Sequence, residues 1–380
     1  MSKVAIVRCE SYDYGEIKKS VHRGIKLLGG ISRFAHKGNK ILLKPNLLTG
    51  DRPERCVTTH PLVFEAVAEL LLTTGAKVSY GDSPPLGSPG RAAQRSGLAE
   101  KAKKLNIELA DFKTKVDIFY DKGIQNKKFT IAKAVLDNDI LISLPKLKTH
   151  GLAKFTGAVK NQFGCIPGVL KGEFHVRLPS ADDFARMLVD LNMFINPKLY
   201  ITDGVQGMEG NGPRGGTPVK MNMLLFSKDP IALDATICRL INLNPEYVPT
   251  IKYGKEAGAG TFAEDEIELV GDQFDSFKNS AFEIDRQPLK PYKQGSVLPF
   301  INRAIVPKPF IMAEKCIQCG ICVTMCPLKP KALSFKENDK SCPPVYNYND
   351  CIRCFCCQEM CPESAIQLKT PVLRKIIDLF

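Results

Sequence analysis

Two cysteine-rich segments near the end of the chain share one spacing. Each has four cysteines separated by two, two and three residues, with a proline directly after the fourth. The segments are Cys316, Cys319, Cys322 and Cys326 before Pro327, and Cys351, Cys354, Cys357 and Cys361 before Pro362. The N-terminus, MSKVAIVRCE, has no apolar export segment. The repeated pattern therefore favours metal ligation over a disulfide framework.

The spacing is typical of bacterial ferredoxins with two 4Fe–4S clusters, in which the fourth cysteine ligates the other cluster. Three cysteines on a tight loop reach three irons of one cubane, and the fourth points across to its neighbour. The sequence predicts two ligand sets: Cys316, Cys319, Cys322 and Cys361 for cluster 1, and Cys351, Cys354, Cys357 and Cys326 for cluster 2.

Zinc knuckles are the alternative, since thiolates also bind tetrahedral zinc. Zinc sites seldom place a third cysteine only three residues after the second, and the repetition with proline favours iron–sulfur clusters. Cys342 and Cys356 are surplus to both ligand sets. We expect each to be a buried or loop thiol.

Residues before the cysteine runs alternate between strand-like and helix-like segments. Expected strands are 3–8, 40–44, 76–80, 107–112, 140–144, 199–202 and 221–226, and expected helices are 15–34, 61–74, 180–194 and 230–241. This alternation predicts an α/β fold with a mostly parallel sheet. A small ferredoxin-like α+β domain should follow it.

The expected boundaries are an α/β domain at 1–285, a proline-rich linker at 286–313, the two-cluster domain at 314–370 and a tail at 371–380. The tail could dock on a membrane or partner, but its length favours a helix packed on the small domain. No segment is long and apolar enough to span a bilayer. We expect a soluble, cytoplasmic protein.

The formal net charge is +13, of which two clusters at about −2 each would offset a part. The remaining basic surplus fits a solvated surface, an acidic redox partner or an anionic small-molecule substrate. Nucleic acid is not expected, because there is no nucleic-acid motif and no tryptophan. A sequence pI near 9.0 is the only feature in favour of it.

Two acidic residues follow expected strands of the α/β domain. Asp82 comes after the strand at 76–80, and Asp203 comes after the strand at 199–202. Ligands of open α/β sheets lie at the carboxyl ends of strands, so the two residues could share a cleft. Either one alone could instead cap a helix or form a turn.

The segment 144–180 is basic and rich in glycine. It contains Lys146, Lys148, His150, Lys154, Lys160, Asn161, Lys171, His175 and Arg177. Such a loop can hold a carboxylate or phosphate, and a histidine within it can deliver protons. We take Lys148, His150, Lys160 and Asn161 as site candidates. A solvated basic loop is the alternative.

A second dense loop is expected at 203–216, and after Asp203 its chemical groups are Glu209 and Arg214. Long ordered loops are often functional, so Glu209 joins Asp82 and Asp203 as a candidate. The glycines of this loop do not form the dinucleotide fingerprint. No flavin or nicotinamide signature is visible, which leaves a further cofactor open.

Four ordered motifs together resemble the family named domain of unknown function 362. They are GDSP, LPKLKTHG…TGAVKNQFG, TDGVQGMEGNGPRGG and KDPIALDA. The C-terminal part resembles the two-cluster ferredoxin domain that is often fused to this family. The resemblance implies a redox protein of this architecture, without one agreed substrate.

Two functions fit these features. The first is a reductase, in which a soluble donor reduces the clusters and the electrons reach a substrate or second cofactor in the α/β domain. Lys148, His150, Lys160 and Asn161 would bind and protonate the substrate, opposite Asp82, Asp203 and Glu209. The second is a non-catalytic electron carrier whose large domain docks a partner enzyme.

Overall fold

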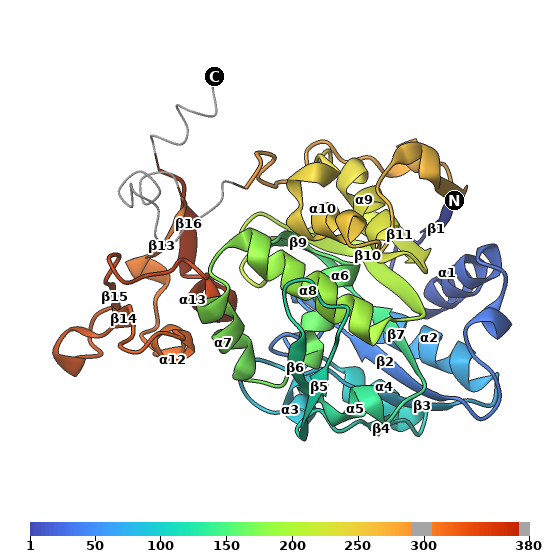
Figure 1. Ribbon diagram of the computed structural model, residues 1–380, viewed down its shortest axis with the longest axis horizontal. Coiled ribbons are helices and arrows are strands. Elements are labelled where there is room, and N and C mark those ends of the chain that lie inside the picture. The colour runs from blue at the N-terminus through green and yellow to red at the C-terminus, as the bar shows by residue number, and fades with distance from the viewer. Residues whose placement is uncertain (290–305, 372–380) are drawn as a thin grey trace.

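The α/β domain is built on one ten-stranded sheet (Figure 1). The computed structural model describes residues 1–289 and 306–371. The strands are β1 (Ser2–Arg8), β2 (Lys40–Pro45), β3 (Lys77–Tyr80), β4 (Glu108–Leu109), β7 (Ile140–Leu144), β8 (Lys146–His150), β9 (Lys154–Thr156), β10 (Leu199–Glu209), β11 (Thr217–Ser227) and β12 (Ile267–Gly271). A separate hairpin pairs β5 (Lys115–Phe119) with β6 (Lys128–Ala132).

The strand order is β12-β1-β11-β10-β7-β2-β3-β4, with β8 pairing with β10 and β9 pairing with β8. Strand β11 is antiparallel to both neighbours, and β9 is antiparallel to β8. The remaining pairs of the sheet are parallel. The predicted α/β fold with a mostly parallel sheet is confirmed.

Helices cover both faces of the sheet. They are α1 (Tyr14–Leu27), α2 (Pro61–Leu72), α3 (Pro89–Arg95), α4 (Leu98–Lys104), α5 (Lys133–Leu136), α6 (Ala158–Asn161), α7 (Leu170–Arg177), α8 (Ala181–Ile195), α9 (Pro230–Leu240) and α10 (Pro249–Glu256). Strand β1 explains the two layers, because its side chains alternate between faces. Val4 and Ile6 join the core under α8 and α9, whereas Ala5 and Val7 join the core under α1 and α2.

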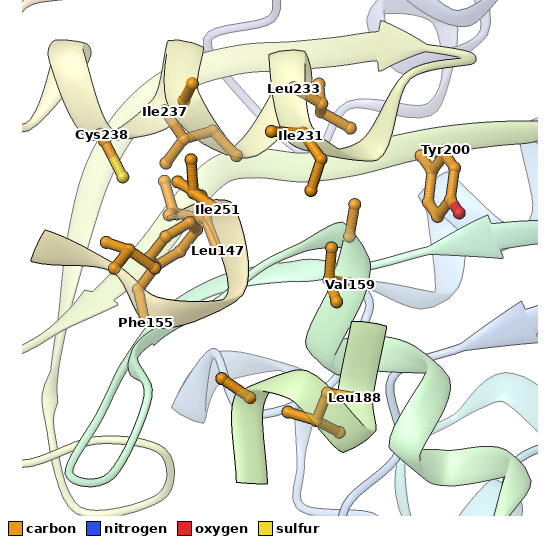
Figure 2. Packing of buried hydrophobic residues seen from close by; sticks show 14 of the residues in the cluster. Leu147, Phe155, Val159, Leu188, Tyr200, Ile231, Leu233, Ile237, Cys238 and Ile251 are labelled. Carbon is orange, nitrogen blue, oxygen red and sulfur yellow. The ribbon is translucent and has the colours of Figure 1, made fainter. Parts of the chain in front are cut away.

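The core on the α8 and α9 side gathers residues that are distant in sequence. Figure 2 shows Leu147 of β8, Val159 of α6, Leu188 of α8 and Ile231 of α9 around one apolar volume. All four are fully buried, at 1% exposure or less. This core fixes β8 and α6, and thereby fixes the polar side chains that these elements carry.

The structure differs from the sequence expectations in two basic or glycine-rich segments. The segment 144–180 is not one loop, because it contains β8, β9, α6 and α7. The expected loop at 203–216 is strand through Glu209, where β10 pairs with β11. Gly207 lies so close to β8 that an added Cβ would be 3.3 Å from Leu147. A glycine is therefore needed at position 207 for close packing of β10 on β8, and not for a turn.

The first helix is shorter than the expected 15–34. It ends at Leu27, and Gly29 and Gly30 follow with φ angles of 98° and 90°. Glycine adopts this left-handed backbone without the steric cost that other residues pay. The prediction ran past this break because it was based on the spacing of apolar residues alone.

The C-terminal module contains two short helices and two small sheets. Its elements are β13 (Lys308–Ile311), α12 (Ile321–Met325), β14 (Leu333–Ser334), β15 (Val345–Tyr346), α13 (Cys356–Met360) and β16 (Ile366–Lys369). Strand β13 pairs with β16, so the module begins within the predicted linker 286–313. Residues 290–305 of that linker and 372–380 of the predicted tail lie outside the described residues.

Within the described ranges, no helix has the length and apolar character that crossing a bilayer requires.

Candidate iron–sulfur sites and the adjoining cavity

The residues assigned to cluster 1 converge in the structure. Cys316, Cys319, Cys322 and Cys361 line one small cavity. The Cys322 thiol is close enough to the other three to interact with them electrostatically. Four converging thiols are the donor set of a 4Fe–4S cubane, and these residues therefore fit the group. Cys361, which the prediction assigns to this set, comes from the second cysteine run.

The residues assigned to cluster 2 also lie near one another. Cys351 interacts electrostatically with Cys354 and with Cys326 of the first run, and Cys357 interacts with Cys354 and Cys351. The Tyr346 hydroxyl is 3.3 Å from the Cys357 sulfur. Hydrogen bonds to cluster sulfurs are one way in which a protein sets the potential of a cluster.

The two surplus cysteines have different surroundings. Cys342 is exposed, whereas Cys356 is buried at the start of α13. Cys356 also lines the large cavity described below. The Cys356 thiol is within hydrogen-bonding reach of Cys354, so it adjoins the residues assigned to cluster 2.

Helix α13 of the module is held against the α/β domain by polar contacts. Arg214 binds the Asp51 carboxylate at 3.0 Å and donates to the Met360 carbonyl at 2.8 Å. Gln358 donates to the Gly212 carbonyl at 3.0 Å. Because these groups are buried, losing one partner would leave a costly unpaired polar group. The contacts place the cluster 2 cysteines at a defined surface of the α/β domain.

A cavity of about 630 Å³ lies between the α/β domain and the module. Helix α7 forms one wall, and Figure 1 shows it beside α13. The module contributes Cys326, Cys356 and Glu359. The α/β domain contributes five of the predicted site residues: Asp82, Lys148, His150, Lys160 and Asn161.

Asp82 is one half of a buried ion pair. Its carboxylate lies 3.0 Å from the Lys44 ammonium and accepts the Leu47 amide at 2.8 Å. Gly164 packs directly on this pair, because an added Cβ would be 1.8 Å from the Asp82 oxygen. Asn161 accepts a hydrogen bond from Lys44 at 3.2 Å. Asp82 and Asn161 thus form a fixed floor of the cavity.

Lys148 is buried, and within the described residues no carboxylate lies at ion-pair distance from its ammonium. Its ammonium donates to the Asn46 side-chain oxygen at 2.8 Å and to the Val57 carbonyl at 2.6 Å. Burial, with a smaller contribution from nearby Lys160, lowers the pKa of Lys148 to about 7. Burial disfavours the charged form of a lysine, which explains the direction. The group can therefore exchange a proton near neutral pH.

His150 faces Glu359 across the boundary between the two parts of the chain. Its Nδ1 accepts the backbone amides of Leu152 and Ala153 at 3.1 and 3.3 Å. The proton of the neutral ring is therefore on Nε2, which lies 2.9 Å from Glu359 Oε1. Burial and Lys160 lower the pKa of His150 to about 4. The imidazole is neutral at pH 7 beside a carboxylate.

Two predicted site residues lie elsewhere. Asp203 binds the Lys146 ammonium at 2.9 Å and accepts the Tyr12 hydroxyl at 2.8 Å. Glu209 accepts the backbone amide of Glu283 at 2.8 Å. Neither residue is among those that line the cavity. The structure thus separates Asp82, which follows β3, from Asp203, which lies within β10.

Sequence reasoning left several cavity residues outside the candidate set. Lys171 and His175 were named only as members of the basic segment 144–180. Glu359 had no signal at all, because it stands between ligand cysteines on a short helix. Its role depends on how the module docks.

Comparisons with known proteins agree with this architecture. The family model for domain of unknown function DUF362 matches residues 41–239. The chain belongs to the DUF362 family. A second model, for a 4Fe-4S dicluster domain, matches residues 308–362. The C-terminal module is therefore a 4Fe–4S cluster-binding domain of ferredoxin type, which supports a role in electron transfer.

A curated relative is the thylakoid-associated protein sll1697 of Synechocystis sp. (strain ATCC 27184 / PCC 6803 / Kazusa). It is 37% identical over 264 residues, which cover 68% of this chain and 80% of the relative.

Two solved structures are similar to this DUF362 chain over part of its length. The lactate racemase apoprotein from Thermoanaerobacterium thermosaccharolyticum has a TM-score of 0.42 and 13% identity, over 63% of this chain and 57% of that protein. A Thermotoga maritima protein has a TM-score of 0.37 and 12% identity, over 67% of this chain and 61% of that protein. The chain thus spans less than two thirds of either protein.

Proposed function

We propose that the protein is a reductase that passes electrons from two 4Fe–4S clusters to a small substrate in the cavity between the domains. The observation that carries this proposal is the shared lining of that cavity. Cys326, an assigned cluster 2 ligand, lines it together with Lys148, His150 and Lys160. A substrate held there would sit next to an electron source. The clusters would supply electrons one at a time.

The residues of the chain would bind the substrate and provide protons. Lys160 and the Asn161 floor would hold it, and Lys148 would act as the general acid. A proton donor works best when its pKa is near the working pH, as that of Lys148 is. His150 would help to position the module against the α/β domain through its contact with Glu359. Asp203 and Glu209 are left out of this site, since neither lines the cavity.

The proposal includes two clusters in one module at 308–371 and an α/β domain that ends before residue 290. A soluble protein is the expected electron donor, and an anionic small molecule is the expected substrate. Anaerobic purification with iron and sulfide counts should give about eight irons per chain. A count of about four irons per chain would contradict the presence of a second cluster.

The reductase proposal can be tested with dithionite-reduced, cluster-loaded protein. Adding a protein-free small-molecule extract should restore the oxidised visible spectrum, and mass spectrometry should detect the reduced product. Lys148→Met should slow this reoxidation at least tenfold, if Lys148 supplies the proton. Lys103→Met, at an exposed lysine on α4, is the matched control. Equal rates in both variants would contradict the proposal.

The electron-carrier alternative is favoured by the basic charge of the chain, which suits an acidic redox partner. In that case partner reduction should weaken steeply with salt, because screening reduces attraction between exposed charges. A His150→Gln variant should then transfer electrons to the partner at the wild-type rate. The reductase proposal instead expects His150→Gln to slow reoxidation of the clusters by the small substrate.

A cytoplasmic location remains our proposal for this chain, and the name of the cyanobacterial relative suggests a membrane surface instead. Fractionation of cells that express the protein distinguishes the two. If the protein is recovered in the membrane pellet and salt washing releases it, association with the membrane surface is favoured.

A further inference from the structure

Three lysines point to what the cavity binds, and this inference rests on the proposed function. Lys148, Lys160 and Lys171 all line the cavity. Lys171 donates to the carbonyl oxygens of Ser83 and Ile166, and Lys148 donates to an amide oxygen and a carbonyl. In residues 1–289 and 306–371, the Lys160 ammonium has no hydrogen-bond or ion-pair partner.

Two of the carboxylates that line the cavity have different neighbours. Asp82 pairs with Lys44 at 3.0 Å, and Glu359 lies 2.9 Å from His150. Among the described residues, none of the three cavity lysines has a carboxylate within ion-pair distance. Burying a cation without an ion-pair partner is costly. Glu359 offsets part of the charge of Lys148 and Lys160, and an anion bound at Lys160 would supply a direct counter-charge.

Two further polar atoms in the wall lack partners. Thr156 is 3% exposed and His175 is 5% exposed, and both line the cavity. Thr156 Oγ1 and His175 Nδ1 have no hydrogen-bond partner within the described part of the chain. Buried polar atoms are nearly always paired in folded proteins, so two orphans in one wall indicate that a ligand satisfies them.

One aromatic ring brings part of this wall together. The ammonium groups of Lys160 and Lys171 lie 5.8 and 5.9 Å from the ring centroid of Phe163. The His175 ring is 6.0 Å from the same ring and stacks on Phe184 at 4.4 Å. Phe163 therefore holds two cations and an imidazole around a single position.

We propose that this wall is an oxyanion subsite that binds a carboxylate or phosphate group of the substrate. Lys160 makes the direct ion pair, while the Thr156 hydroxyl and the His175 imidazole supply hydrogen bonds. Lys171 and Lys148 add positive field from behind. Bound this way, the acidic group anchors the substrate and directs the rest of it toward the Cys326 side of the cavity.

The subsite can be tested by equilibrium binding on oxidised, cluster-loaded full-length protein. The probes are inorganic phosphate and succinate, titrated by calorimetry at constant ionic strength. Wild-type protein should bind at least one of them, and the tighter probe identifies phosphate or carboxylate. Lys160→Met should weaken that binding at least tenfold, and Thr156→Val about threefold. The exposed-lysine control Lys103→Met should bind as wild type.

Lys160→Arg guards against a folding defect, because it keeps the cation and should retain binding within about threefold. Iron content and circular dichroism should match wild type in each variant. The subsite is refuted if wild-type protein binds neither probe below about 10 mM, or if Lys160→Met binds as tightly as wild type.

The binding assay needs no electron transfer, so the two proposals can fail separately. If anion binding depends on Lys160 but nothing reoxidises the reduced clusters, the subsite proposal is supported and the reductase proposal is contradicted. Reoxidation by an extract without Lys160-dependent anion binding would remove only the subsite.

Discussion

Lys146 and Lys148 lie two residues apart on β8, and both are buried, but their partners differ. The Lys146 ammonium is 2.9 Å from Asp203 and 2.7 Å from the Tyr12 hydroxyl. The Lys148 ammonium instead donates to two uncharged oxygens, from Asn46 and Val57. One lysine is neutralised within the domain, and the other presents its charge to the cavity. Ion pairing, and not residue type, separates a structural lysine from a candidate functional one.

The largest expected effect comes from breaking the paired side of this comparison. Lys146→Met leaves the fully buried Asp203 without its counter-charge, which should lower the free energy of unfolding by about 3–5 kcal/mol. Lys148→Met removes a costly buried charge along with two hydrogen bonds, so it should cost less than about 2 kcal/mol. Urea unfolding followed by circular dichroism measures both. Equal losses would show that pairing does not distinguish the two lysines.

The second effect concerns an ion pair on the cavity side, between Lys44 and Asp82. Gly164→Ala would push a Cβ into this pair and should cost about 1–3 kcal/mol, as overpacking does. Gly90→Ala is the control, because Gly90 lies in α3 and its nearest neighbour to a new Cβ is 3.6 Å away. That change should be neutral or stabilise by up to about 1 kcal/mol. Equal losses would argue against tight packing at Gly164.

A pH series sharpens the comparison on the unpaired side. Burial lowers the pKa of Lys148 to about 7 from its ordinary 10.5. Between these values the unfolded chain holds the proton and the folded chain does not, so the free energy of unfolding should rise with pH from about 7 to 10. Below pH 7 both states are charged and this contribution is constant.

Lys148→Met should make that rise shallower by up to about 1.4 kcal/mol per pH unit. Some of the rise should remain, since burial lowers the pKa of Lys171 to about 7 as well. Urea unfolding at several pH values between 7 and 10 provides the slopes. The exposed-lysine variant Lys103→Met should keep the wild-type slope, and an unchanged slope in Lys148→Met would mean that Lys148 stays charged.

The smallest expected effect is at Glu209, which lies outside both lysine environments. Its side chain accepts one backbone amide, and glutamine can accept the same bond. Glu209→Gln should change the free energy of unfolding by less than about 0.5 kcal/mol. A loss as large as that of Lys146→Met would place Glu209 in a charged network that its contacts do not contain.

Much of the fold followed from local patterns. The strand at Ile140–Leu144 has the expected bounds, and α2 and α9 begin at the predicted prolines Pro61 and Pro230. β10 was predicted to end at Thr202 because its later residues read as a loop. Only pairing with β11 extends it to Glu209. Non-local strand pairing of this kind leaves little local signal.

The candidate site was predicted only in part, because it too depends on contacts between residues that are distant in sequence. Lys148, His150 and Lys160 were chosen from one segment, and the cavity gathers them. Asp203 was grouped with Asp82 because both follow strands, yet the neighbours of each differ. Strand β10 pairs with β8 at Asp203 and Lys146, which brings the carboxylate to Lys146. That partner could not be chosen from spacing alone.

The sequence by itself predicted the cluster ligands, because their spacing is a local property of short loops that must reach a cubane. It also determined the layered α/β architecture, since apolar period and turn residues act over a few positions. Only the tertiary structure decided which lysines are paired and which acidic residues share the cavity. Ion pairs such as Lys146–Asp203 and contacts such as His150–Glu359 join residues 57 or more positions apart, and strand order and module docking alone bring them together.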